Sequence, residues 1–306
     1  MLTLAIPWLL ALLTIAFIVC LIKKKWKVAL LLAVLITVMN WWGEIFPLRI
    51  TPLKITSSGN TVSVMCFNIN CAGDAENNKA EKIVSMIWQS NPDIVFISEF
   101  ADHSPYRMDS LIKKYYPYST FPSNLCNHYF YSKYPLIKYR RLYAEKEYQL
   151  GVYVVDVIKD RDTITILGCH LASNNYNNDR SYLTPDRLKS FCDYIDYFHN
   201  IKRANSERRT ETDAIIKEIN SIPYSAILMG DFNDVSGSEI MCALERHQLK
   251  DAWWECGVGY GATIHNPLSY RIDHIMYTKG LILQTIKVLC SNGVSDHDAL
   301  YAVFKY

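Results

Sequence analysis

The chain has 306 residues, 50% of them apolar, and a formal net charge of +2 at pH 7, which suits one large hydrophobic core. Four lysines fall within the first 48 residues, and the remainder holds 28 basic and 29 acidic residues. This balance lacks the excess positive charge with which duplex nucleic-acid-binding domains meet phosphates. The nine cysteines form no C-x-x-C pair, which excludes zinc-ribbon spacing, and their odd number predicts no extensive disulfide framework.

The first 48 residues predict a transmembrane helical hairpin. Residues 2–22 are uncharged and mostly apolar, and a second apolar run covers residues 28–46 with Glu44 near its end. Each run is close to the roughly 20 residues that span a bilayer. The turn between them, KKKWK, carries four lysines and is expected in the cytoplasm. Both ends of the hairpin, and the domain that follows, are then expected outside the cytoplasm, in a multi-pass protein of the cell membrane.

A signal peptide is the main alternative for the first run. This run lacks a positively charged start and is long for the apolar part of a signal peptide. Lipid modification at Cys20 is also disfavoured, because the preceding Phe-Ile-Val lacks the small residues of such a site. The hairpin is therefore the preferred interpretation, with residues 49–60 as a linker.

Residues 61–306 alternate strand-like and helix-like patterns and predict one domain with a mixed sheet core covered by helices. In chain order, the expected elements are strand Thr61–Asn70, helix Glu76–Gln89, strand Asp93–Phe100, helix Tyr106–Tyr115, strands HYFYS, LGVYVVDVI and TITILGCHL, helices within Leu183–His199 and Glu207–Ile219, strand SAILMGDF, helix Glu239–His247, and strands RIDHIMY, LQTIKVL and ALYAVFK. The basic run KRANSERR, Lys202 to Arg209, is interpreted as a solvated helix face or loop.

Polar side chains recur where the expected strands end or begin. They are Asn68, Asn70, Glu99, His170, Asp231, Asn233, Asp273, His274, Asp296 and His297. Singly, each has a structural explanation: Glu99 as a helix cap, His170 as a hydrogen-bonded core histidine, Asp273 as an ion-pair partner of Arg271. Together they predict a shared site, because ligands of α/β proteins gather at the carboxyl ends of strands.

The motifs FNIN, SEF, GCHL, GDFND, RIDHI and SDHD occur in the order seen in the endonuclease/exonuclease/phosphatase superfamily. The chain resembles this superfamily from about Thr61 to Tyr306. The resemblance implies a four-layer α/β sandwich with two facing mixed β-sheets, here preceded by the two-helix transmembrane hairpin. It also implies Mg²⁺-dependent hydrolysis of a phosphate ester in a nucleic acid, a phospholipid or an inositol phosphate. Mn²⁺ is expected to substitute for Mg²⁺, and no obligate protein partner is inferred beyond the bilayer.

A hard divalent cation needs oxygen ligands, and three of the motif residues offer them. Glu99 is expected to be the direct ligand, with Asn68 and Asp296 near it, directly or through water. Asn70 stands where some nucleases of the superfamily carry an aspartate, which leaves a second carboxylate ligand open.

Five residues match the catalytic positions of the superfamily. Asp231 is expected to orient or deprotonate the attacking water, and Asn233 to donate to a phosphate oxygen. His170 is expected to donate to the phosphate or the leaving group. His297 corresponds to the terminal histidine that acts as base or electrostatic stabiliser, and Asp273 is expected to fix its tautomer.

The sequence leaves two functional classes open. One is a membrane-anchored, Mg²⁺-dependent phosphoesterase, within which a DNA or RNA nuclease is the alternative to a lipid or small-molecule phosphoesterase. The near-neutral charge and the lack of a long basic insertion argue against tight duplex binding. The other class is a non-catalytic, membrane-anchored binding module that retains the fold, and the intact polar residues at every motif argue against it.

Overall fold

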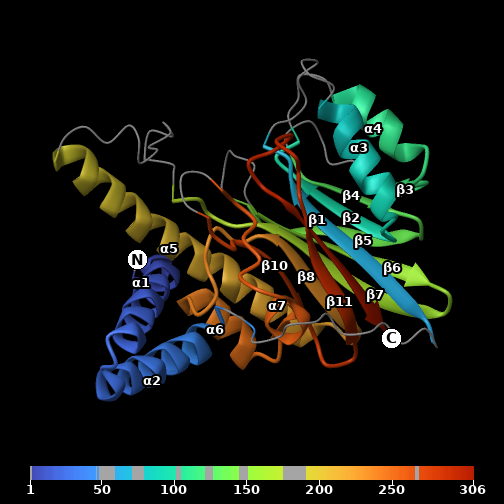
Figure 1. Ribbon diagram of the computed structural model, residues 1–306. Helices are drawn as coiled ribbons and strands as arrows, with labels where there is room; N and C mark the ends of the chain where they lie inside the picture. The colour runs from blue at the N-terminus through green and yellow to red at the C-terminus, as the bar shows by residue number, and fades with distance from the viewer. Residues whose placement is uncertain are drawn as a thin grey trace.

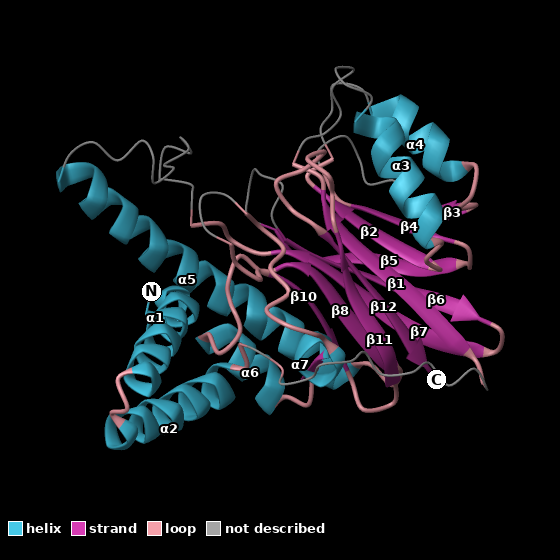
Figure 2. Cartoon of the chain, viewed as in Figure 1, coloured by secondary structure: helices cyan, strands magenta, loops and turns pink. Residues whose placement is uncertain are grey.

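The computed structural model describes residues 2–45, 47, 59–70, 79–100, 105–120, 127–144, 151–174, 191–265 and 269–306. Two six-stranded mixed sheets face each other, as predicted (Figures 1 and 2). In the first sheet the strand order is β11 (Ile282–Leu289), β12 (Ala299–Lys305), β1 (Thr61–Asn68), β2 (Ile94–Ser98), β4 (Tyr129–Ser132) and β3 (Tyr118–Ser119). In the second it is β5 (Leu136–Ala144), β6 (Gly151–Lys159), β7 (Asp162–His170), β8 (Ser225–Asp231), β10 (Asp273–Tyr277) and β9 (Lys250–Asp251).

Helices cover the outer faces of both sheets. α3 (Lys79–Ser90) and α4 (Pro105–Lys113) pack on the first sheet, and α5 (Phe191–Ser221) and α6 (Glu239–Arg246) pack on the second (Figure 1). The short helix α7 (Ala252–Cys256) contributes Trp253 to the core between the sheets. The described residues therefore form helix, sheet, sheet and helix layers. The start of the predicted helix Glu76–Gln89 and nearly all of the predicted linker 49–60 lie outside the described residues.

Strand β1 shows how the sequence builds these layers. Its side chains alternate between faces, as the pleat of a strand requires. Val62, Val64 and Cys66 enter the core between the sheets, whereas Met65 and Phe67 enter the core beneath α3 and α4. A strand buried on both faces reads as a continuous apolar run, which is why the sequence signal for β1 is strong.

Between Leu183 and Ile219 the expectation of two helices is wrong, because one helix, α5, runs from Phe191 to Ser221. Residues 183–190 lie outside the described part of the chain. The basic run continues the helix, supported by an ion pair one turn apart between Arg203 and Glu207, with Nη1 and Oε2 2.6 Å apart. The interpretation of this run as a solvated face fails at Arg208, whose side chain is fully buried.

The structure has helices at both predicted apolar runs, α1 (Leu2–Ile22) and α2 (Trp26–Gly43). Among the described residues, only Ala5–Ile22 in α1 is long and apolar enough to cross a membrane, with a mean hydropathy of 2.7 and 11% of the stretch buried. The apolar part of α2, Trp26–Trp41, is shorter. Two spans over residues 2–22 and 28–46 are therefore not supported, since α2 ends before Glu44, which adopts a left-handed conformation with φ of 47°.

Both outer ends of the helical pair contact the part of the chain that forms the two sheets and their covering helices, called the sheet domain below. Trp8 of α1 packs edge-on against Tyr270, and Trp41 of α2 packs edge-on against Trp254, each with ring centroids 6.3 Å apart. The lysine-rich turn lies at the opposite end of the pair (Figure 1). The two helices thus enclose a wedge whose open side faces the domain.

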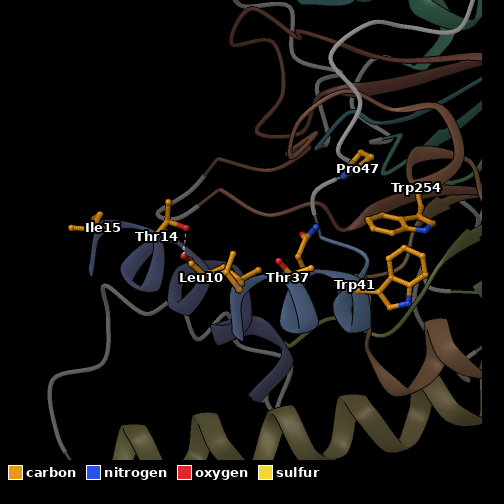
Figure 3. A pocket seen from close by; sticks show the side chains of 10 residues that line it. Leu10, Thr14, Ile15, Thr37, Trp41, Pro47 and Trp254 are labelled. Carbon is orange, nitrogen blue, oxygen red and sulfur yellow. Dashed lines mark hydrogen bonds between the residues drawn. The ribbon is translucent and has the colours of Figure 1, made fainter. Parts of the chain in front are cut away.

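An apolar cavity of about 850 Å³ lies in this wedge, between α1, α2 and Trp254 (Figure 3). Two threonines line it, but their hydroxyls donate within their own helices. Thr14 Oγ1 donates to the carbonyl of Leu10 and Thr37 Oγ1 to that of Ala33, each at 2.8 Å. Because these hydroxyls are satisfied, the threonines contribute little polarity to the cavity wall.

Gly168 in β7 leaves room for aromatic side chains of the facing sheet. A Cβ atom at this position would lie 2.3 Å from the ring of Phe96 in β2 and 2.7 Å from that of Phe130 in β4. The two phenylalanine rings also contact each other, with centroids 4.9 Å apart. The glycine therefore provides the space that the aromatic pair fills.

We expect Gly168→Ala to destabilise the protein by about 1–3 kcal/mol, because the added methyl group overpacks this interface. Phe96→Leu in the same chain should recover part of the loss, since it removes the atoms that the methyl group meets. Thermal unfolding of the two single variants and the double variant gives the coupling free energy. Strictly additive losses would show that Gly168 and Phe96 do not compete for this space.

Candidate active site

Strand direction brings the predicted site residues together. The pairs β1–β2 and β7–β8 are parallel, and the other pairs among the described strands are antiparallel. Asn68 ends β1 opposite Ser98 at the end of β2, and His170 ends β7 opposite Asp231 at the end of β8. Asp273 begins the antiparallel strand β10, also opposite Asp231. The ends of parallel strands and the start of an antiparallel strand thus meet at one edge of the sandwich.

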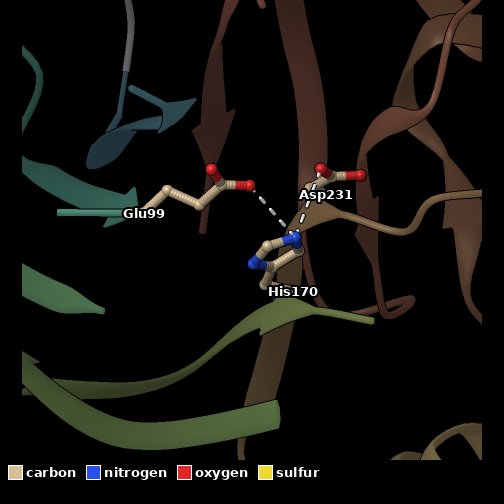
Figure 4. A group of neighbouring side chains, drawn as sticks. All are labelled: Glu99, His170 and Asp231. Carbon is tan, nitrogen blue, oxygen red and sulfur yellow. Dashed lines mark ion pairs between the residues drawn. The ribbon is translucent and has the colours of Figure 1, made fainter. Parts of the chain in front are cut away.

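Glu99, His170 and Asp231 form a first group, with one ligand atom of each within 4.8 Å of the others (Figure 4). His170 Nε2 lies 3.5 Å from Glu99 Oε1 and 3.6 Å from Asp231 Oδ2. Asn68 joins the two carboxylates, because its Nδ2 donates to Glu99 Oε1 at 2.9 Å and to Asp231 Oδ2 at 3.0 Å. Asn68 and Glu99 come from the first sheet and the other two residues from the second, so the group bridges both sheets.

Asp231, Asp273 and His297 form a second group of the same kind. His297 Nδ1 lies 2.8 Å from Asp273 Oδ2, and His297 Nε2 lies 3.8 Å from Asp231 Oδ2. All three side chains are buried. Burial alone would lower the pKa of the imidazole, but the carboxylates of Asp273 and Asp231 outweigh it and raise the pKa of His297 to about 10. The arrangement fixes a proton on Nδ1 and turns Nε2 toward the shared carboxylate.

Two site residues adopt a backbone conformation that is uncommon outside glycine. Glu99 has φ of 54° and Asn233 has φ of 50°. Asn233 is held there by its own N–H, which donates to Asp231 Oδ1 at 2.8 Å, and by its Nδ2, which donates to the carbonyl of Leu171 at 2.9 Å. Such conformations cluster at functional sites, where neighbouring contacts hold them.

The glycine of the GDFND motif has its own steric reason. Gly230 has φ of 140°, and a Cβ atom there would lie 2.0 Å from the carbonyl oxygen of Cys169 in the neighbouring strand. Only glycine allows β7 and β8 to approach this closely just before His170 and Asp231. The motif therefore encodes both the close approach and the carboxylate that follows it.

Two predicted metal ligands are placed less directly than Glu99. Asn68 turns its Nδ2 toward the carboxylates, and its Oδ1 accepts from the N–H of Asn70 at 3.0 Å. Asp296 is half-buried and belongs to neither group of ligand atoms. Its negative charge favours the protonated form of His297 and so helps to raise the pKa of that histidine. Six of the eight predicted site residues thus touch within one cluster, with Asn233 and Asp296 beside it.

The pairing of Asp273 distinguishes its functional from its structural interpretation. Its carboxylate contacts His297, whereas Arg271 Nη1 donates to Asp251 Oδ2 at 2.6 Å and lies 3.1 Å from His274 Nδ1. Burial alone would raise the pKa of Asp251, but Arg271 and His274 outweigh burial and hold the pKa of this carboxyl well below its usual range. Arg271 therefore belongs to a separate buried cluster behind the site, and it does not neutralise Asp273.

Sequence reasoning missed His128, which lies against the site. Its ring centroid is 5.5 Å from that of His170, and its ring stacks on Tyr153 at 5.0 Å and Phe96 at 5.9 Å. Burial and the neighbouring His170 lower its pKa, which favours the neutral imidazole. His128 opens the motif HYFYS, where nothing in the pattern separates it from the other aromatic residues of a buried strand.

Comparison with known proteins assigns the chain to a family. The model described as "Endonuclease/Exonuclease/phosphatase family" matches residues 65–297, which include every predicted site residue. The chain belongs to this family. Its members hydrolyse phosphate esters, and the acidic and histidine cluster lies within the matched region. No curated protein matches the chain in sequence.

Several solved structures share this fold at low sequence identity. A D. rerio TDP2 humanized by 14 mutations is 16% identical with a TM-score of 0.59, and the match covers 80% of this chain and 99% of that one. SmcL is 13% identical with a TM-score of 0.54, covering 81% and 99%. A mutant beta toxin from Staphylococcus aureus with bound magnesium ions is 14% identical with a TM-score of 0.56, covering 79% and 99%. These matches support the family fold.

Proposed function

We propose that residues 61–306 are the catalytic domain of a membrane-anchored, Mg²⁺-dependent phosphoesterase that hydrolyses phosphodiester or phosphomonoester bonds by in-line attack of water. The observation that carries this proposal is the pair of groups that share Asp231. One group offers carboxylate oxygens beside a histidine, and the other holds a histidine oriented by a second carboxylate. Metal-assisted hydrolysis of an anionic ester needs both a cation site and oriented proton carriers.

The donor set suits a hard cation. Glu99 would hold Mg²⁺ directly, with Asn68 and Asp296 beside it, and Mn²⁺ would substitute. Asn68 lies beside Glu99 but turns its Nδ2 toward that carboxylate at 2.9 Å, so its oxygen would contact the cation only after the amide turns or through a water. The similar S. aureus structure contains magnesium ions. When bound, the cation would neutralise charge on the phosphate and lower the barrier to attack.

Five residues of this chain would perform the remaining chemistry. Asp231 would accept a proton from the attacking water or orient it, and Asn233 would donate to a phosphate oxygen. His170 would donate to the phosphate or the leaving group. Asp273 would hold the proton on His297 Nδ1, so that Nε2 faces the reacting atoms. With a pKa of about 10, His297 is protonated at neutral pH, so it would act there as electrostatic stabiliser, and it would act as base only once Nε2 has lost its proton.

Metal dependence gives the direct test of this proposal. We expect the purified protein to hydrolyse bis-p-nitrophenyl phosphate with Mg²⁺, to lose activity in EDTA, and to regain it with Mg²⁺ or Mn²⁺. Glu99→Gln should raise the Mg²⁺ concentration needed for half-maximal rate, because it removes the charged ligand. A panel of plasmid DNA, RNA, phospholipid and inositol phosphates then distinguishes a nuclease from a lipid or small-molecule phosphoesterase. Full hydrolysis in chelator would refute metal dependence, and no hydrolysis of any substrate would favour a non-catalytic module.

The two histidines are expected to differ in their dependence on the leaving group. Asp273→Asn should lower kcat on the order of a hundredfold by misorienting His297. The double variant Asp273→Asn/His297→Ala should have a kcat only a little lower than that of His297→Ala alone, because the two residues act as a unit. His170→Ala should also lower kcat, but less for p-nitrophenolate, which needs little protonation, than for an alkoxide leaving group. Steady-state kinetics on both ester types measure these differences. Equal losses on both esters would assign His170 to phosphate stabilisation, and near-normal rates for all folded variants would remove these residues from the mechanism.

Among the described helices, only α1 is by itself long and apolar enough to cross a membrane. We also propose that α2 crosses with it as the shorter arm of a hairpin that anchors the domain. The support is that Trp8 near the start of α1 and Trp41 near the end of α2 both contact the sheet domain. The two outer ends of the pair then lie on one side, and the lysine-rich turn lies on the other. The positive-inside rule places that turn in the cytoplasm and the catalytic domain outside it.

Reporter fusions after Tyr306 test this topology. We expect alkaline phosphatase to be active and green fluorescent protein to be dark, because the fusion point lies outside the cytoplasm. Replacing the lysines of the turn by glutamine should weaken this orientation, since it removes the charge that holds the turn inside. An inactive alkaline phosphatase fusion together with a fluorescent green fluorescent protein fusion would instead indicate a single span and a cytoplasmic domain.

A further inference from the structure

Arg208 is the largest fully buried side chain among the described residues, and it lies behind the candidate site on α5. Its Nη1 donates to the carbonyl of Ala172 at 2.6 Å and to Asn174 Oδ1 at 3.0 Å. Its Nε lies 3.6 Å from Asp234 Oδ2. A buried guanidinium costs several kcal/mol unless it is paired and hydrogen-bonded. Here Nη2 donates to Asn205 Oδ1 of the same helix, and the other partners come from two different loops.

The first loop follows β7 and carries His170 into the site. Ala172, two residues after His170, is held at both of its backbone polar groups by α5. Arg208 donates to its carbonyl, and one turn later on the helix Glu211 Oε2 accepts its N–H at 3.0 Å. The path of the chain immediately after His170 is therefore set by two charged side chains of one helix.

The second loop follows Asp231 at the end of β8 and carries Asn233 and Asp234. Burial raises the pKa of Asp234, and the charge of Arg208 opposes this effect and favours its carboxylate. Asn233 Nδ2 donates to the carbonyl of Leu171, so the second loop is also tied to the first. Arg208 thus contacts residues of both loops, Ala172 and Asn174 in the first and Asp234 in the second.

We propose that Arg208 is a positioning residue that holds the loops after β7 and β8 in register and thereby places His170 against Asp231. The inference rests on the proposed phosphoesterase function. Arg208 lies outside both groups of ligand atoms, so it acts through the loops. Replacing a buried ion pair by apolar residues often leaves stability unchanged or improves it. A buried arginine that is hydrogen-bonded to one loop and ion-paired with the other therefore fits a role in geometry better than a role in stability.

The experiment compares Arg208→Met and Arg208→Lys with Arg209→Met in the full-length chain. Arg209 is the next residue of α5, but its side chain is exposed and pairs with Glu239 on the surface, which makes it a matched control. kcat and KM for bis-p-nitrophenyl phosphate are measured at saturating Mg²⁺. Hydrogen exchange of peptides covering residues 168–174 and 230–235 is measured in the same samples, because this readout needs no turnover.

We expect Arg208→Met to lower kcat about a hundredfold with KM nearly unchanged, since small displacements of reacting groups carry losses of this size. Exchange should accelerate in both peptides. Arg208→Lys keeps the charge beside Asp234 but has fewer donors, so we expect about a tenfold loss, and it carries the test if Arg208→Met does not fold. Arg209→Met should match the wild type in both measurements.

Wild-type kcat in folded Arg208→Met or Arg208→Lys would overturn the inference, as would unchanged exchange in both peptides. The inference would also be overturned if activity fell only because less of the variant is folded. In that case KM and the hydrogen exchange of the folded fraction would be unchanged. Absence of hydrolysis by the wild-type protein would refute the proposed function alone, because the exchange measurement would still decide whether Arg208 orders the two loops.

Discussion

The site depends on burying the carboxylate of Asp231, because both groups of ligand atoms share it. Removing a carboxylate from water costs several kcal/mol unless hydrogen bonds and charges compensate it. Asn68 and the backbone of Asn233 donate to its two oxygens at 3.0 and 2.8 Å, and Nε2 of His170 and of His297 lie 3.6 and 3.8 Å away. These partners come from both sheets, so the carboxylate of Asp231 is compensated only when the two sheets are packed against each other.

Topology explains how partners so far apart in sequence reach one carboxylate. A parallel pair such as β7 and β8 needs a long crossover, and α5 lies within that crossover. Ile215 and Ile219 of α5 pack on the outer face of the second sheet, which fixes the helix against β7 and β8. Earlier on the same helix, Arg208 then reaches the loops that leave both strands. The crossover that makes His170 and Asp231 neighbours therefore also carries Arg208.

Sequence patterns predicted the elements whose physical cause is local. Doubly buried strands such as β1 and β8 read as apolar runs, and polar residues at their ends marked the site. Strand β5 was missed because it lies at a sheet edge and carries Lys138, Arg140 and Arg141, which resemble a loop. These charges are matched only in three dimensions, for example by the ring of Tyr153, 5.4 Å from the Arg141 guanidinium. Arg208 was misread for the same reason, since its loop partners are distant in sequence.

The contact between the N-terminal helices and the sheet domain includes a buried polar interaction. Arg271 Nη2 donates to the carbonyl of Glu44 at 3.1 Å, while its Nη1 donates to Asp251. The left-handed conformation of Glu44 ends α2 where this carbonyl meets the guanidinium. Separating α2 from the domain would remove this acceptor, and Nη2 would keep its hydrogen bond to Ser236 Oγ. Since Arg271 precedes Asp273 by two residues, this hydrogen bond ties the end of α2 to the start of β10, where Asp273 contacts His297.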